Sequence, residues 1–410
     1  MVKNYGQLLF FNIGFILCGL SGKLLIIYHN IIFVWRLKLK KIPLCKPSLG
    51  DEEIKSVIEV LKSGWMTHGP KNREFEKQFQ TYLGVKHAIT MNSCTSALHL
   101  ALVGLGIEGE VIVPSFTFVA SVNAILLAGA RPVLVDIEKG SRNISPVEIE
   151  RAITPATEAI MVVHYAGLPA AMPQIIEIAQ KYNLRIIEDS AECLGGSYND
   201  KQTGSFDIGC FSFFPTKNIT TGEGGMFTTN DDDLADRIRA LCAHGIDSTT
   251  FKREKKAKPW IRIASRVGYN FRMSNFMAAI GVEQMKKIES LNECRRRLAK
   301  KYINQLKHIS SIQFQQVPEG YIHSWQMFTI LVPEAVRNGL LHYLRTHGVE
   351  ASVHFDPPVH LQAPYSDLRR SDDLHTTKEV ASSIITLPMY PTMMSGDVTY
   401  VCEIIDNFSI

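Results

Sequence analysis

Residues 211–225 read FSFFPTKNITTGEGG, a stretch that places a single lysine, Lys217, between two apolar segments. The segment before it, Gly209–Phe213, and the segment after it, Gly225–Thr228, have the length and composition of buried strands. Most lysines lie on the surface, but the flanking phenylalanines and the turn at Gly222–Gly225 favour a buried position. A lysine amine is a nucleophile only when it is partly deprotonated, which requires desolvation or nearby positive charge. Lys217 is therefore a candidate for covalent catalysis.

Five further apolar segments precede this stretch, and helix-length stretches separate them. These segments are His87–Met91, Val111–Val113, Val133–Val135, Ile160–Val163 and Ile186–Ile187. Strands that alternate with helices predict an α/β fold, with a mostly parallel seven-stranded sheet covered on both faces. Ligands bind at the carboxyl ends of the strands in such sheets, so the residues directly after each segment are candidate site residues.

Two of these positions carry hydroxyl or aromatic side chains. Residues 92–96 (NSCTS) lie between a strand and a helix, where hydroxyl groups and free backbone amides form an anion site. Plain helix capping is the alternative. Residues 114–118 (PSFTF) offer a ring that can lie flat on a planar ligand, with core packing as the alternative.

A pair of acids, Glu188 and Asp189, follows the segment Ile186–Ile187. Side chains alternate across a strand, so we expect one carboxylate to face the site and the other to face away. A carboxylate beside a pyridine nitrogen keeps that nitrogen protonated and makes the ring an electron sink. A helix cap or a salt-bridged acid is the alternative.

The chain after residue 230 has a different pattern. One long helical stretch is expected from about Ser274 to Leu306, followed by short apolar segments and two more helices. The sequence therefore predicts three parts: an extension at 1–41, a large domain at 42–284 and a smaller α+β domain at 285–410. Residues 246–265 contain KREKKAKPWIR and are expected to form a solvated basic loop.

The charge of the chain is concentrated at its N-terminus. The formal net charge is +4, yet residues 1–41 hold six basic residues and no acid, which leaves 38 basic and 40 acidic residues in the body. A near-neutral body argues against a nucleic-acid surface. The eight cysteines show no CxxC spacing, which is typical of free thiols in a reducing compartment. We therefore expect a cytoplasmic protein without a metal site.

Two apolar runs, 8–20 and 24–35, stand before the basic residues at 36–41. Each is shorter than the roughly 20 residues needed to cross a bilayer, although read together they could make one imperfect span. Three interpretations stay open: a membrane anchor with a basic flank, an interfacial hairpin or helix, and an extension outside the working protein. Membrane association through residues 8–35 is thus one of three hypotheses.

The motifs together resemble the DegT/DnrJ/EryC1/StrS family of sugar aminotransferases, over about residues 42–405. The resemblance is carried by IPLCKPSLGDEEI, SGWMTHGP, VIVPSFTFVAS, IIEDSAE, FSFFPTKNITTGEGG, GYNFRMSN and SVHF. It implies an aspartate-aminotransferase-like fold of type I, the cofactor pyridoxal 5'-phosphate, and a homodimer with shared active sites. Family members that act as dehydratases have histidine in place of the lysine, so Lys217 argues against that branch.

The resemblance also implies residue roles. Lys217 is expected to hold the cofactor as a Schiff base and to move the proton, and Asp189 to pair with the ring nitrogen. The phosphate is expected at Ser93, Cys94, Thr95 and Ser212, and at Asn270 of the neighbouring subunit. Phe118 and Ala191 are expected on the two ring faces. Glu192 is expected near the ring oxygen, where a carboxylate repels a phenolate unless one of them is protonated. Arg272 and His354 are candidates for substrate contacts.

The expected reaction moves nitrogen from an amino acid, glutamate by preference, to a keto sugar linked to a nucleoside diphosphate. The product would enter surface polysaccharide, a glycan or an antibiotic sugar. Two alternatives remain. A catalytically silent scaffold would bind the cofactor without turnover, and a membrane-attached enzyme would act on a lipid-linked sugar.

Overall fold

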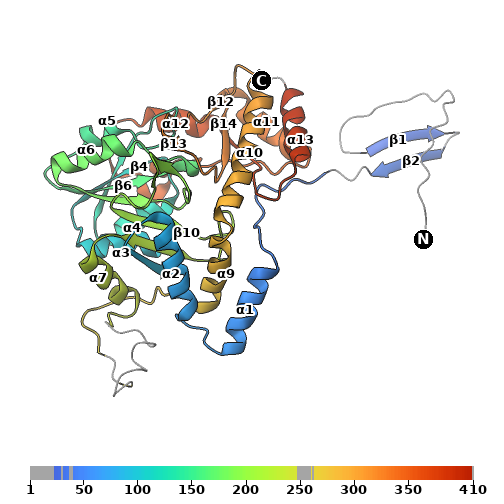
Figure 1. Ribbon diagram of the computed structural model, residues 1–410. Coiled ribbons are helices and arrows are strands. Elements are labelled where there is room, and N and C mark those ends of the chain that lie inside the picture. Colours follow the sequence, from blue (N-terminus) through green and yellow to red (C-terminus); the bar gives the residue numbers. More distant parts are fainter. Residues whose placement is uncertain (1–22, 29–30, 37–39, 247–259, 261–262, 409–410) are drawn as a thin grey trace.

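The computed structural model describes residues 23–28, 31–36, 40–246, 260 and 263–408 (Figure 1). The strands are β1 Lys23–Tyr28, β2 Ile31–Arg36, β3 His87–Met91, β4 Glu110–Pro114, β5 Arg131–Val135, β6 Thr157–Val163, β7 Arg185–Asp189, β8 Ser197–Tyr198, β9 Lys201–Gln202, β10 Ile208–Ser212, β11 Gly225–Thr229, β12 Gln313–Phe314, β13 Tyr321–Ile322, β14 Phe328–Leu331, β15 Arg369–Arg370 and β16 Ile384–Leu387. The α-helices are α1 Asp51–Ser63, α2 Pro70–Leu83, α3 Cys94–Leu105, α4 Val119–Leu127, α5 Pro146–Ala152, α6 Met172–Tyr182, α7 Asp232–Cys242, α9 Asn275–Met285, α10 Ile288–Leu306, α11 Glu334–Thr346, α12 His375–Ser383 and α13 Ser395–Asp406.

The central sheet has eight strands in the order β15-β5-β4-β6-β7-β10-β11-β3. All seven predicted strands are present, and β15 is an eighth strand of two residues that pairs in parallel with β5. Neighbours from β15 to β10 are parallel, whereas β11 is antiparallel to both β10 and β3. The α/β class and the mostly parallel sheet are confirmed.

Helices cover both faces of this sheet (Figure 1). In β4, Val111 and Val113 pack in the core shared with α3, α4 and α7, whereas Ile112 packs in the core shared with α5 and α6. The middle of β4 is therefore apolar at consecutive positions, because alternate side chains enter different cores. Phe75 and Phe79 of α2 meet Phe211 and Phe213 in a third core.

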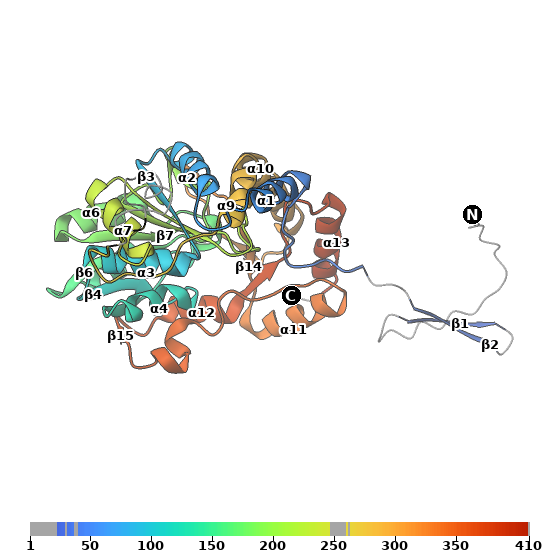
Figure 2. The ribbon, with the colours of Figure 1, turned by 90° about the horizontal axis from the view of Figure 1, so that it is seen from below.

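The C-terminal part contains a second sheet of three antiparallel strands, β12-β14-β16, which packs with α10, α11 and α13 (Figure 2). Two connections cross the predicted boundary at residues 284 and 285. Ile42 packs in this C-terminal core and bonds to the backbone of Gly348 and Glu350, while β15 joins the central sheet. The division into domains stays a prediction.

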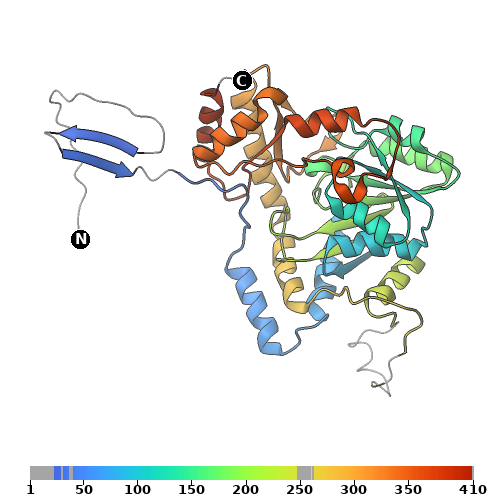
Figure 3. The ribbon, with the colours of Figure 1, turned by 180° about the vertical axis from the view of Figure 1, so that it is seen from behind.

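The long helix expected from Ser274 to Leu306 is two helices, α9 and α10, separated by Lys286 and Lys287. At this break the amide of Lys287 bonds to the carbonyl of Gln284, three residues back. The Lys287 side chain reaches the carboxylates of Glu52 and Glu53 on α1, which lies alongside α9 (Figure 3). The apolar periodicity continues through the break, so the sequence pattern did not reveal it.

The described part of the N-terminal segment forms a hairpin, in which β1 and β2 pair antiparallel from Lys23 with Arg36 to Tyr28 with Ile31. The run at 8–20 lies outside the described residues, as does most of the basic loop at 246–265. Among the helices that the structure describes, none has the length and hydropathy required to cross a membrane.

Candidate active site

A cavity of about 430 Å³ opens at the carboxyl ends of the parallel strands. Its floor includes the last residues of β6, β7 and β10, and the N-terminal end of α3. Its other wall comes from the C-terminal part, and from Leu44 and Cys45. Ten of the twelve predicted site residues line it: Ser93, Cys94, Thr95, Phe118, Asp189, Ala191, Glu192, Ser212, Lys217 and His354. Elements distant in sequence therefore converge where the parallel-sheet rule places a ligand.

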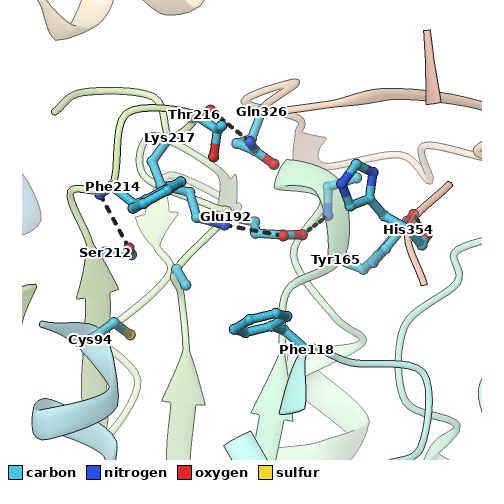
Figure 4. Close-up of polar contacts among 12 residues, drawn as sticks. Cys94, Phe118, Tyr165, Glu192, Ser212, Phe214, Thr216, Lys217, Gln326 and His354 are labelled. Carbon is cyan, nitrogen blue, oxygen red and sulfur yellow. Dashed lines mark hydrogen bonds and ion pairs between the residues drawn. The ribbon is translucent and has the colours of Figure 1, made fainter. Parts of the chain in front are cut away.

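Lys217 extends into this cavity from the loop after β10 (Figure 4). Its side chain is 17% exposed, and Nζ lies 3.2 Å from Oε1 of Glu192. The other Glu192 oxygen accepts a hydrogen bond of 3.0 Å from the amide of Ala166. Both Glu192 oxygens are thus engaged, and the carboxylate holds the lysine amine over the floor of the cavity.

Asp189 is a buried carboxylate at the end of β7. Its Oδ2 accepts from the Ser121 hydroxyl at 2.7 Å, and its Oδ1 accepts from the Ala191 amide at 3.2 Å. Burial raises the pKa of Asp189, and these two hydrogen bonds oppose the shift because they favour the charged form. The neighbouring Glu188 points to the opposite face and is fully buried, as strand alternation predicts.

The N-terminus of α3 forms the side of the cavity nearest to β11. Ser93 caps this helix through its hydroxyl, which accepts from the amide of Ser96 at 3.1 Å. The first turn of α3 contains no acid, so its amide dipoles favour an anion. Gly225 allows the close packing here, since a Cβ at this position would lie 2.4 Å from the Ser93 backbone.

Cys94 and Phe118 complete the floor. The Cys94 thiol lies 3.9 Å from Oδ1 of Asp189, and burial raises the pKa of this cysteine well above its ordinary value, so it stays protonated. Phe118 is 61% exposed although it is a large apolar residue, because its ring faces the cavity. An exposed ring on a cavity floor is available to a planar ligand.

His354 and Ser212 also line the cavity, from the C-terminal part and from the end of β10. Nδ1 of His354 lies 2.9 Å from the Thr386 hydroxyl, and burial lowers the pKa of this histidine, which favours the neutral ring. The Ser212 hydroxyl accepts from the amide of Phe214 at 3.4 Å. Neither group forms an ion pair among the described residues.

Asn270 and Arg272 do not line the cavity within one chain. Nη2 of Arg272 donates to the Asn270 side-chain oxygen at 2.9 Å and lies 3.2 Å from the His244 ring. Asn270 is exposed, and its segment is tied to the α3 end of the cavity by a hydrogen bond from the Asn92 amide to the carbonyl of Phe271. Their roles in a neighbouring subunit's site stay predictions.

Several residues that line the cavity or support its side chains were not predicted from the sequence. Ser121 bonds to Asp189, and Gln326 donates to the carbonyl of Thr216 at 2.8 Å beside Lys217. Ser121 lies one helical turn after Thr117, the only local signal that could have found it. Gln326 and Met389 come from distant segments with no motif of their own, and Cys45, which lies within the quoted segment 42–54, was not singled out.

This donor set suits an aromatic phosphate ester with an electrophilic carbonyl. The cavity offers an amine nucleophile, a buried carboxylate for a ring nitrogen, an exposed ring for stacking and a helix N-terminus for phosphate. No group of three or more side chains that could bind a metal occurs among the described residues.

Two curated proteins are similar to this chain over most of its length. An uncharacterised protein of Methanocaldococcus jannaschii, MJ1066, is 40% identical over 87% of this chain and 95% of its own. The spore coat polysaccharide biosynthesis protein SpsC of Bacillus subtilis is 36% identical over 88% and 95%.

Several solved structures are also similar to this chain. The structure of DesV from S. venezuelae, in complex with a ketimine intermediate, is 30% identical, with a TM-score of 0.83, over 89% of this chain and 97% of that one. The putative sugar aminotransferase Spr1654 of Streptococcus pneumoniae, solved in a PLP-form and a PMP-form, is 27% identical to this chain. The TM-scores of the two forms are 0.81 and 0.83, over 89% of this chain and 97–98% of their own. The sequence model of the DegT/DnrJ/EryC1/StrS aminotransferase family matches residues 47–406, so the chain belongs to this family.

Proposed function

We propose that this chain is a pyridoxal-phosphate-dependent aminotransferase that moves an amino group from L-glutamate to a nucleotide-linked keto sugar. The observation that carries the proposal is the convergence of the Lys217 amine and the buried Asp189 carboxylate on one cavity. The PLP and PMP forms of Spr1654 support the cofactor, since they are the two forms between which a transamination cofactor alternates.

The residues that would hold the cofactor surround the cavity on all sides. Lys217 would bond to it through Nζ, and Asp189 would pair with its ring nitrogen. Phe118 and Ala191 would lie against the ring, while Ser212 and the first turn of α3 would take the phosphate. When bound, the cofactor supplies an electron-accepting ring that stabilises negative charge on the substrate carbon.

The chain itself orients groups and moves a proton. When it is not bonded to the cofactor, the Nζ amine of Lys217 is placed to remove a proton from the substrate carbon and to deliver that proton to the cofactor. Glu192 holds this amine from one side, at 3.2 Å. Leu44, Met327 and Leu387 line the cavity together with Phe118, and these apolar walls keep water from the reacting atoms.

The sugar substrate rests on the family and on SpsC, a spore coat polysaccharide biosynthesis protein. His354 lies at the cavity edge and would contact the sugar or the donor carboxylate. Arg272, and Asn270 near the phosphate, would act from the neighbouring subunit of a homodimer. Both are polar and lie outside the cavity of their own chain, as this role requires.

The test is an absorbance titration of the protein loaded with pyridoxal phosphate. We expect L-glutamate to replace the absorbance band of the lysine-bound cofactor with that of the aminated cofactor, and a nucleotide-linked keto sugar to restore the first band. Lys217→Ala should abolish both changes. Lys55→Ala, an exposed lysine of α1, should retain them.

Each other outcome has a clear meaning. A protein that binds cofactor but ignores every amino acid would support a silent scaffold and refute the proposal. If glutamate changes the absorbance band and only a sugar without a nucleotide restores it, the protein would still be an aminotransferase. The proposal of a nucleotide-linked acceptor would then be refuted.

A further inference from the structure

Helix α10 carries a buried arginine on the face where its neighbours are apolar. Ile288, Leu291, Leu298 and Tyr302 form the buried stripe of this helix, and Arg295 lies within the stripe at 2% exposure. Burial lowers the pKa of Arg295 to about 10. No carboxylate forms an ion pair with it among the described residues, although an unpaired buried cation is unfavourable.

The Arg295 guanidinium donates instead to three backbone carbonyls around the active site. Nη2 donates to the carbonyl of Lys217 at 3.4 Å, and Nη1 donates to the carbonyls of Gln326 at 3.1 Å and Met389 at 3.5 Å. Gln326 and Met389 line the same cavity as Lys217. One rigid, planar side chain therefore joins the lysine loop to two segments of the opposite wall.

The residues on either side of Lys217 are held by the same elements. The Thr216 carbonyl accepts from Gln326 Nε2 at 2.8 Å. The Asn218 side chain donates to Asn292 of α10 at 2.8 Å and to the carbonyl of Ser324 at 3.3 Å. Three consecutive residues are thus fixed by long-range contacts, with Arg295 on the central one. A leucine would fill the stripe but would leave the Lys217 carbonyl without this donor.

We propose that Arg295 is a positioning residue for Lys217: it fixes the lysine backbone against the opposite wall of the cavity, so that the amine keeps its place. The inference rests on the proposed function for the chemistry of Lys217. It predicts that loss of Arg295 loosens the lysine loop locally, beyond any general loss of stability.

Arg142 provides a matched control. It is 1% exposed, its pKa is likewise lowered to about 10 by burial, and it donates to the carbonyls of Gln313 and Thr329, each at 3.2 Å. Among the described residues, its guanidinium forms no hydrogen bond with residues 213–222. Arg142→Met therefore removes an equally buried cation with carbonyl partners, away from Lys217.

The first experiment measures hydrogen exchange of cofactor-free protein, resolved by peptide. Arg295→Met should speed exchange in residues 213–222 about tenfold more than Arg142→Met does. Arg142→Met should instead speed exchange near residues 313–331. Equal exchange of residues 213–222 in the two variants would overturn the proposal. This readout requires no cofactor, so it is independent of whether the proposed reaction occurs.

The second experiment uses Arg295→Lys, which keeps the charge and protects folding but lacks the planar fork. With loaded enzyme, kcat should fall roughly 10- to 100-fold, because small displacements of a reacting group have effects of this size. The KM for glutamate should change less than about threefold. A kcat equal to that of the native enzyme, with normal exchange in residues 213–222, would refute the positioning role.

Discussion

Replacement of Ser121 by alanine should change the pH at which the enzyme becomes active. Oδ2 of Asp189 accepts a hydrogen bond of 2.7 Å from the Ser121 hydroxyl. Among the described residues, the only other oxygen or nitrogen donor to this carboxylate is the Ala191 amide, which bonds to Oδ1. Ser121→Ala removes the shorter of the two. The variant leaves a buried carboxylate with one such donor fewer.

The size and sign of the effect follow from the geometry. A hydrogen bond to a charged group contributes about 1.5–3 kcal/mol. One pKa unit corresponds to about 1.36 kcal/mol, so the loss raises the pKa of Asp189 by roughly 1–2 units. Burial already raises this pKa, and Ser121 opposes that shift, so the two changes add. The carboxylate then ionises only at higher pH, and activity that depends on it is lost sooner as the pH falls.

The assay is the single-turnover rate of the glutamate half-reaction as a function of pH. We expect the acid limb to move upward by roughly 1–2 pH units in Ser121→Ala, with the plateau above it unchanged. Ser190→Ala is the control, because the Ser190 hydroxyl is buried next to Asp189 in sequence but has no hydrogen-bond partner among the described residues. Coincident acid limbs in the two variants would show that Ser121 does not control Asp189.

Three further changes test separate parts of the structure. Gly225→Ala would place a Cβ 2.4 Å from the Ser93 backbone, and overpacking of about 1–3 kcal/mol should weaken cofactor affinity in an equilibrium titration by roughly fivefold or more. Unchanged affinity would contradict the phosphate site at α3. Phe118→Ala should raise the cofactor Kd about 2- to 10-fold, because stacking on the ring is lost. The midpoint of thermal unfolding should stay nearly unchanged, because Phe118 is 61% exposed. A large fall in this midpoint would indicate that Phe118 packs in the core. Tyr302→Phe removes the bond to the Pro388 carbonyl and should lower the free energy of unfolding by about 1–2 kcal/mol in urea while kcat is retained. A loss of kcat would mean that this bond also orders the cavity wall.

The central sheet could be predicted because its local signals agree. Val111, Ile112 and Val113 are all fully buried, so the strand appears in the sequence as an uninterrupted apolar run. Gly64 adopts a left-handed conformation with φ of 72° and ends α1, which is the position where glycine commonly terminates a helix. β15 was missed because its two residues are exposed arginines, and only their position beside β5 makes them a strand.

The candidate site was predictable where a strand end places a chemically distinctive residue. Asp189 and Lys217 each follow an apolar segment, and a parallel sheet brings such ends together. Arg295 and Ser121 have no such signal. An arginine in a helix is ordinarily a surface residue, and only the tertiary contacts of α10 show that Arg295 bonds to the lysine loop.

The charges of the cavity explain why Asp189, and not Glu192, is the carboxylate available to a cationic ligand. Glu192 is already balanced by Lys217 at 3.2 Å and by the Ala166 amide. Asp189 forms no ion pair among the described residues, and its donors are the neutral Ser121, Ala191 and Cys94 groups. A buried carboxylate without a cation is unfavourable, so a ligand with a protonated ring nitrogen gains most by binding there. If Nζ of Lys217 bonded to the same ligand, the Glu192 carboxylate would lose its ion pair with the free lysine amine but would keep its hydrogen bond from the Ala166 amide.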